Sequence, residues 1–137
     1  MVYRSRLRQQ DGFIREVAWV VLVIAVGAVV FLDGMALFST HQAVRKDAAT
    51  AVDEARAEYA QTLSVPAAQL AARQYLLKTG SEMVRFAHAT GPEGEPVLSV
   101  SVRTEAHTYA FRFLGVVPGL DDWVRDMTHP VATESSE

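Results

Sequence analysis

Cysteine is absent from the 137 residues of this chain. Disulfide bonds, thiol chemistry and cysteine-based zinc sites are therefore excluded. A strong charge of either sign is also missing, because the formal net charge is only −3. The lysines and arginines are scattered and form no basic stripe interleaved with aromatic residues. This pattern predicts no nucleic-acid partner.

Motifs for catalysis or cofactor binding are missing too. The sequence holds no glycine-rich phosphate loop and no Gly-x-Ser-x-Gly element. The adjacent carboxylates of Asp121 and Asp122 are expected in a loop or turn. A zinc site needs three or four convergent ligands, and no His-x-x-x-His pair or carboxylate cluster supplies them. We therefore expect no enzyme activity, no cofactor and no metal site, and we interpret the histidines as surface or half-buried side chains: His41, His88, His107 and His129.

What the chain does have is one long apolar run near its start. No charged residue occurs from Val17 to Leu32, and apolar residues continue past Asp33 and Gly34 to Phe38. A membrane-spanning helix needs about 20 mainly apolar residues. We therefore predict a transmembrane helix over residues 13–38, with the lipid bilayer as its partner. Two alternatives remain, a buried core helix and a signal peptide, but the run has no polar stripe and exceeds a typical signal segment.

Flanking charge predicts the orientation of this helix. Four arginines precede the run or stand at its start, whereas only Arg45 and Lys46 follow closely, mixed with acidic residues. Cytoplasmic flanks carry the excess of basic residues in membrane proteins. We expect a single-pass protein of the cell membrane, with residues 1–12 as a basic cytoplasmic tail and the C-terminal domain outside.

Asp33 is a charged residue inside the outer end of the run. One interpretation is a polar contact that sets the register with a partner helix. The other is an interfacial residue in contact with headgroup water. The sequence leaves both open.

The helical pattern continues beyond the membrane. Alanine and valine recur at helical spacing from Val44 to Ala55, followed by Tyr59 and Leu63. We predict one continuous helix from about Phe13 to about Thr62. Pro66 should end it, with Ser64 capping a short second helix that stops at Gly80.

Strand patterns replace helical ones after Gly80. Residues 82–90 partly alternate, with Val84, Phe86 and His88 on one face, and a Gly/Pro-rich turn follows. Residues 98–107 alternate cleanly, which predicts an antiparallel hairpin. Residues 109–115 are expected to end this strand or form one helical turn, and the segment from Trp123 to Val131 to give a third short strand. The expected fold class is α+β, with an extracytoplasmic domain over 39–131 and a disordered tail over 132–137.

The order of these parts resembles a known family. The segment Phe31-Leu-Asp-Gly-Met-Ala-Leu37 is similar to an Asp-Gly-x-Ala element, and Val100 to Gly115 is similar to a late Val-x-Val…Phe-x-x-Leu-Leu-Gly segment. Both elements occur in the TadE/TadG-like pilus-assembly proteins of the tight-adherence (Flp) pilus system. The resemblance covers nearly the whole chain and rests on the order of degenerate motifs.

This resemblance implies a pseudopilin-like, pilin-fold component of a pilus or secretion apparatus. Its implied partners are other pilin-like subunits and platform proteins, in homo- or hetero-oligomers formed through the N-terminal helix. Glu16, Gly27, Asp33 and Gly34 are the candidate helix-packing residues. Gly27 and Gly34 lie seven apart, on one face of a helix.

The resemblance also implies a processing site between Gly12 and Phe13. Some family members are cut after a glycine, with a glutamate at the fifth position beyond it. Here Glu16 is at the fourth position and Arg15 precedes it, and both departures argue against cleavage. An alternative function from another class is a membrane-tethered binding module, which would need a concave apolar pocket with converging polar groups.

Overall fold

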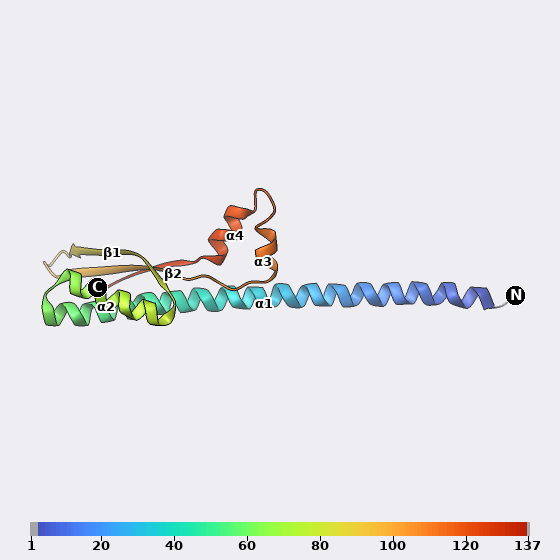
Figure 1. Cartoon of the computed structure of the whole chain (residues 1–137), viewed down its shortest axis with the longest axis horizontal. Helices are drawn as coiled ribbons and strands as arrows, with labels where there is room; N and C mark the ends of the chain where they lie inside the picture. The colour runs from blue at the N-terminus through green and yellow to red at the C-terminus, as the bar shows by residue number, and fades with distance from the viewer. Residues whose placement is uncertain (1–2, 137) are drawn as a thin grey trace.

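The computed structural model describes residues 3–136, with side chains described from Phe13 onward. The fold is α+β, as expected: two helices come first, and a small antiparallel sheet follows, with two short helices between its second and third strands (Figure 1). The elements are α1 (Tyr3–Thr62), α2 (Val65–Thr79), β1 (Glu82–Thr90), β2 (Pro96–Arg103), α3 (Ala110–Leu114), α4 (Asp121–Thr128) and β3 (Val131–Ser135).

Helix α1 is a single rod that runs nearly the full length of the molecule (Figure 1). It ends at Thr62, where the sequence predicted its end, and it begins at Tyr3, before the predicted start at Phe13. The predicted basic tail is therefore helical from Tyr3, while Met1 and Val2 lie outside the described residues. Proline is absent from the sequence before Pro66, so nothing breaks the helical hydrogen bonds.

A tight reversal joins α1 to α2. Leu63 adopts φ +50°, and its N–H donates to the Tyr59 carbonyl at 2.8 Å, which closes the last turn of α1. The Ser64 side chain then accepts from the Ala67 N–H and caps α2. Gly80 ends α2 in the left-handed conformation, at φ +78°. The Ser64 cap and the Gly80 stop are confirmed, whereas the left-handed conformation of Leu63 was not predicted from the sequence.

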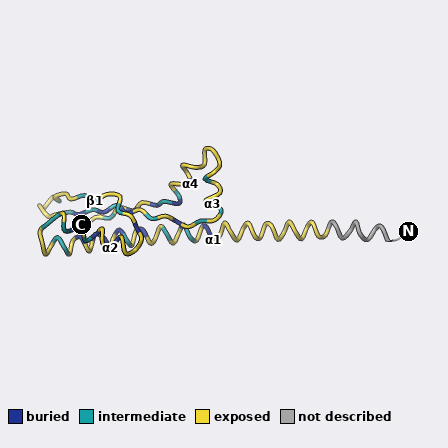
Figure 2. The backbone as a smooth tube through the Cα atoms, in the orientation of Figure 1, coloured by how far each residue is buried: buried dark blue, intermediate teal, exposed yellow. Residues whose placement is uncertain are grey.

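The sheet is an antiparallel meander in the order β1-β2-β3, so the predicted hairpin is confirmed. It lies against the outer half of α1, next to α2 (Figure 1). The core lies between the helices and the sheet, in the stretch that is dark blue in Figure 2. Its buried members are Val44, Ala48, Ala51, Val52, Ala55, Ala68, Ala72, Leu76, Leu98, Val100, Val102 and Ala132.

The alanines that recur at helical spacing along α1 form a stripe, the alanine stripe, that is central to this core. Ala48, Ala51 and Ala55 are fully buried, so their small side chains let α2 and β2 come close to the backbone of α1. Tyr59 is partly buried at the edge of the core, whereas Leu63 lies outside it and is 77% exposed. The stripe therefore ends one helical turn earlier than the sequence predicted.

Strand β1 differs from its predicted alternation. The register shifts between Met83 and Arg85, which leaves Val84 as the extra residue of a β-bulge. Met83 and Phe86 pack against the core, while Val84 is exposed. The prediction that Val84 shares one face with Phe86 is wrong, because a bulge reverses the alternation.

The C-terminal part also departs from the predictions. Residues 110–114 form the helical turn α3, one of the two expected options. The predicted third strand from Trp123 is instead helix α4, whose first turn holds Asp121 and Asp122, where acidic side chains favour a helix start. The predicted disordered tail is wrong for residues 132–135, which belong to β3. This strand pairs with β2 and buries Ala132, while Glu137 lies outside the described residues.

Candidate functional site

The part of α1 from Phe13 to Leu32 stands free of the rest of the described chain. The side chains from Phe13 to Leu32 are exposed on every face of the helix (Figure 2). The most apolar window of α1 has a mean hydropathy of 2.6, yet only 11% of it is buried. A core helix of a soluble protein would be mostly buried. Within the described residues α1 is the one helix that is long and apolar enough to cross a membrane.

Among the described side chains of α1, counted from Phe13, Asp33 is the first that another segment of the chain covers. Its side chain is completely buried, with 0% exposed. Its Oδ1 accepts from the backbone N–H of Tyr109 at 2.7 Å. Its Oδ2 accepts from the N–H groups of Ala110 and Phe111, at 2.6 and 3.1 Å. Both carboxylate oxygens are therefore satisfied within the chain.

These three N–H groups belong to the start of α3, where a helix has no internal acceptors for them. Tyr109, the residue at the cap position, supplies no side-chain hydrogen bond of its own. Asp33 accepts these hydrogen bonds from its position on α1, and its negative charge is favourable at the positive end of the α3 dipole. Asp33 thus fastens α3 to the side of α1.

Neither sequence interpretation of Asp33 describes this position. Its carboxylate faces neither headgroup water nor a partner helix, since α3 of the same chain covers it. The sequence holds two weak signals for the contact. One is a charge at the end of an apolar run, and the other is a helical turn without a capping side chain at Tyr109.

The other candidate helix-packing residues remain uncovered. Gly27 and Gly34 have no atom near the position where a side chain would begin, so this face of α1 is open. Glu16 and Phe13 are exposed as well. Gly12 lies in the part of α1 for which only the backbone is described. The structure therefore brings Asp33 alone among these residues into contact with another element.

A second polar connection holds the outer domain together. The Ser81 hydroxyl donates to Oδ2 of Asp47 at 2.6 Å and lies 2.7 Å from Oγ1 of Thr104. A hydroxyl has one proton, so Thr104 is the donor in the second bond. The chain of bonds joins α1, the turn before β1 and the end of β2. Sequence reasoning missed it, because the three residues are far apart along the chain.

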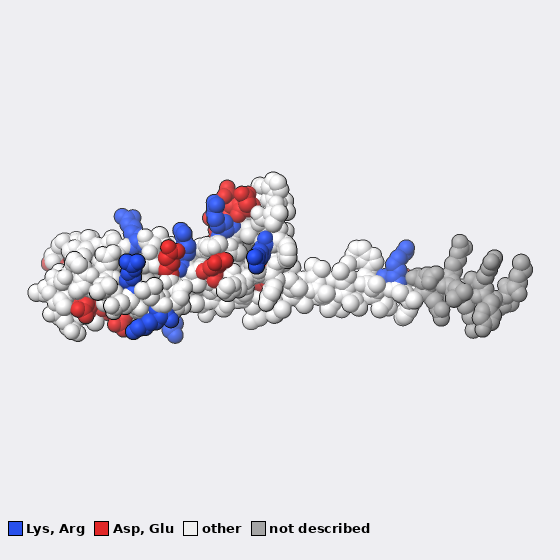
Figure 3. All heavy atoms as spheres, viewed as in Figure 1, with Lys and Arg blue, Asp and Glu red and all other residues white. Residues whose placement is uncertain are grey.

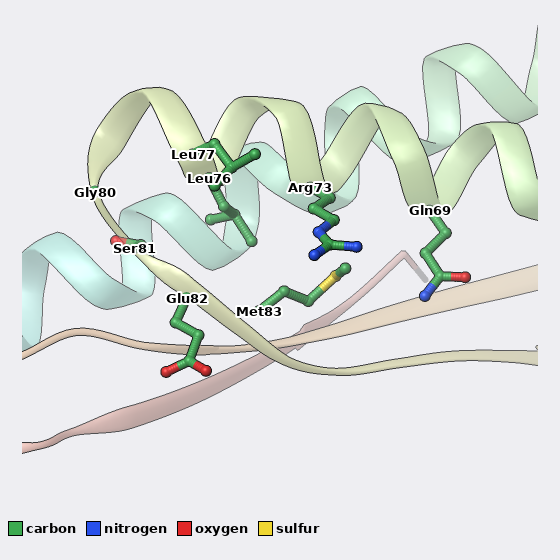
Figure 4. A pocket seen from close by; sticks show the side chains of 8 residues that line it. All are labelled: Gln69, Arg73, Leu76, Leu77, Gly80, Ser81, Glu82 and Met83. Carbon is green, nitrogen blue, oxygen red and sulfur yellow. The ribbon is translucent and has the colours of Figure 1, made fainter.

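A shallow hollow lies between α2 and the start of β1 (Figure 4). Arg73 and Met83 point toward each other across it, whereas Glu82 points away from α2 (Figure 4). Its polar groups therefore do not converge on one point. Within the described residues no three histidine, aspartate or glutamate side chains gather as metal ligands. His88 lies instead beside Tyr59, with ring centroids 5.9 Å apart.

Two observations thus define the site, an uncovered apolar rod and the fastening of α3 to its outer end at Asp33. Comparisons with models of protein families, with curated proteins and with solved structures found no match to this chain.

Proposed function

We propose that this chain is a single-pass membrane protein with a structural role in a Tad/Flp-type pilus or secretion apparatus, as a pseudopilin-like component without catalytic activity. The observation that carries the proposal is the division of α1. Its segment from Val17 to Leu32 is apolar and uncovered on all faces, while its second half supports a small sheet domain. A subunit of this shape can sit in a bilayer and pack helix against helix with its neighbours.

Because Asp33 is buried, the uncharged surface of α1 reaches the length that a membrane span needs. The uncharged run from Val17 to Leu32 is somewhat short of a full span. Beyond it, the one charge before Phe38 belongs to Asp33, which is hidden under α3, while Met35 and Phe38 are exposed and apolar. The surface from Val17 to Phe38 therefore offers lipid no charge, over about 33 Å at 1.5 Å per residue.

Charge on either side of this segment supports a cytoplasmic N-terminus. Arg15 stands just before the span, and three more arginines precede it in the sequence. Ser39, Thr40 and His41 follow the span and lead into the sheet domain. The basic excess on the N-terminal side supports an orientation with that side in the cytoplasm and the sheet domain outside.

The open glycine face supports association through α1. Gly27 and Gly34 are both uncovered, and seven residues bring them to the same side of the helix. Helices in lipid associate by close packing of small residues, because lipid offers no hydrophobic drive between them. A neighbouring helix can approach α1 along this face without meeting the chain's own outer domain.

The alternative, a tethered binding module, has less support. It needs a concave pocket with converging polar groups. The hollow at Arg73 and Met83 is open, and the side chains of Arg73 and Glu82 point in different directions (Figure 4). No specific observation favours a ligand there.

Deletion of the gene in its source organism tests the structural role. We expect surface filaments, or secretion by the associated apparatus, to be lost and to return with the full chain. A chain that begins at Asp33 lacks the anchor and should fail to restore them. Normal filaments and secretion in the deletion strain would contradict the proposal. A gene neighbourhood with a secretion ATPase and polytopic platform proteins would support it independently.

A further inference from the structure

An exposed apolar lobe projects from the rod beside Asp33. It consists of residues 109–124, which include α3, the following loop and the first turn of α4. Phe113 is 77% exposed and Val116 is 79% exposed, although both are large and apolar. The exposed apolar side chains of the lobe are Tyr109, Phe113, Leu114, Val116, Val117, Leu120 and Trp123. Nothing else in the described chain covers them.

The lobe is held at a defined level along α1. Asp33 binds its first residues through three backbone N–H groups. Beyond its other end, the Ala106 N–H donates to the Thr128 carbonyl at 2.8 Å, which fixes the end of α4 to the segment that follows β2 and leads into the lobe. Figure 1 shows α3 beside α1 and the loop after it projecting sideways. The lobe therefore stands at the outer end of the apolar rod.

Charge is distributed unevenly over the lobe. No charged residue occurs from Phe113 to Leu120, whereas Asp122 and Arg125 form an ion pair on α4. In Figure 3 the outermost margin of the lobe toward the N-terminal half of α1 is uncharged, most acidic and basic atoms of the lobe gather on its other side, and basic atoms also lie over α3, which contains Arg112. The apolar margin thus faces the same way as the apolar rod.

We propose that the outer leaflet of the bilayer covers this lobe, so that α3 and the loop after it form a second, interfacial membrane contact. This inference rests on the membrane anchor in the proposed function and does not need the pilus role. Tyrosine and tryptophan favour the membrane–water interface, where Tyr109 and Trp123 would lie. Apolar side chains of interfacial segments enter the boundary between headgroups and acyl chains by about 5–10 Å. The lobe is continuous with the lipid-facing surface of α1, which favours lipid over a protein partner.

The two tryptophans of the chain allow a direct test. In Trp19→Phe the only tryptophan is Trp123 in the lobe, and in Trp123→Phe it is Trp19 in the rod. Each full-length variant is reconstituted into phosphatidylcholine vesicles with bromine on the acyl chains, either near the headgroup or near the chain end. We expect Trp123 to lose most of its emission to the headgroup-proximal bromines and much less to the deep ones.

The outcomes separate the lobe from the anchor. If Trp19 is quenched and Trp123 is not, the lobe inference is overturned while the anchor stands, whether Trp123 faces water or a second copy of the chain. If neither tryptophan is quenched, the proposal that α1 anchors the chain in the membrane is contradicted, and the inference about the lobe is contradicted with it. Combining Phe113→Ser and Val116→Ser should weaken quenching of Trp123. Combining Leu70→Ser and Leu77→Ser, which alters two exposed apolar side chains on α2, should leave it unchanged.

Discussion

Asp33 and Ala110 are separated by 77 positions in the sequence, yet the Ala110 N–H lies 2.6 Å from Oδ2 of Asp33. This contact marks the position on α1 where the exposed apolar segment ends and the outer domain begins. It also compensates a charge that would otherwise lie within an apolar surface. The same hydrogen bonds therefore lengthen the lipid-compatible segment and fix the lobe beside it.

Replacement of Asp33 by asparagine should release α3 from α1. The asparagine amide has one acceptor oxygen and an NH2 group that cannot accept, so at least one of the three N–H donors loses its partner. A hydrogen bond to a charged group contributes about 1.5–3 kcal/mol. We expect amide exchange at residues 109–111 to accelerate by about tenfold or more, measured by hydrogen exchange of the full chain in detergent micelles.

The matched control for this variant is Asp53→Asn, at an exposed position of the same helix. It removes the same charge and should leave exchange at residues 109–111 unchanged. Equal protection of these amides in the wild-type chain and in Asp33→Asn would show that the carboxylate does not hold α3.

The Ser81 hydroxyl should matter more than a similar hydroxyl on the surface of the sheet. Ser81→Ala leaves Asp47 and Thr104 without their shared partner, and a buried polar group left unsatisfied costs about 1–3 kcal/mol. Ser101→Ala removes an exposed hydroxyl pair with Thr133, which contributes about 0.2–1 kcal/mol. Urea unfolding in micelles compares the two free energies of unfolding, and a larger loss for Ser101→Ala would contradict the account.

Leu63→Gly should stabilise the reversal between α1 and α2. Leu63 holds φ +50°, a left-handed conformation that costs a side-chain-bearing residue roughly 1–2 kcal/mol. Its side chain is exposed, so little packing is lost, and the greater freedom of glycine in the unfolded chain offsets part of the gain. We expect a net increase in the free energy of unfolding of up to about 1 kcal/mol. Leu63→Ala keeps the strain and should not show this increase.

The glycine face of α1 should lie against a neighbouring helix in the membrane. Since the chain has no cysteine, Gly27→Cys introduces a unique thiol. Oxidation of membranes that contain this variant should yield a disulfide-linked pair with a copy of the chain. Ala25→Cys, about 200° around the helix from Gly27, is the matched control and should yield much less. Equal cross-linking at both positions would indicate random collision.

Local signals in the sequence were sufficient for much of the fold. The apolar segment from Val17 follows from the length of an uncharged run, and the alanine stripe from Val44 follows from helical periodicity. Ser64 and Gly80 act on backbone groups within a few residues of themselves, so their capping roles are readable without tertiary knowledge. The alternation of apolar and polar residues in β2 likewise predicts a strand with one buried face.

The features that the sequence did not predict depend on contacts between distant segments. The burial of Asp33 requires the position of α3, which no local pattern encodes. The bulge at Val84 is set by the pairing of β1 with β2, and β3 needs β2 as its partner before Ala132 can be buried. Asp121 and Asp122 were interpreted as turn residues, although acidic residues also favour the first turn of a helix.

Labelling of Glu93→Cys tests the central claim most directly, since this residue lies in the exposed turn of the outer hairpin. The account predicts that a membrane-impermeant maleimide labels this variant on intact cells, and that the labelled chain stays in the membrane after alkaline extraction. A chain recovered as a soluble monomer without detergent, or labelled only after lysis, would contradict it.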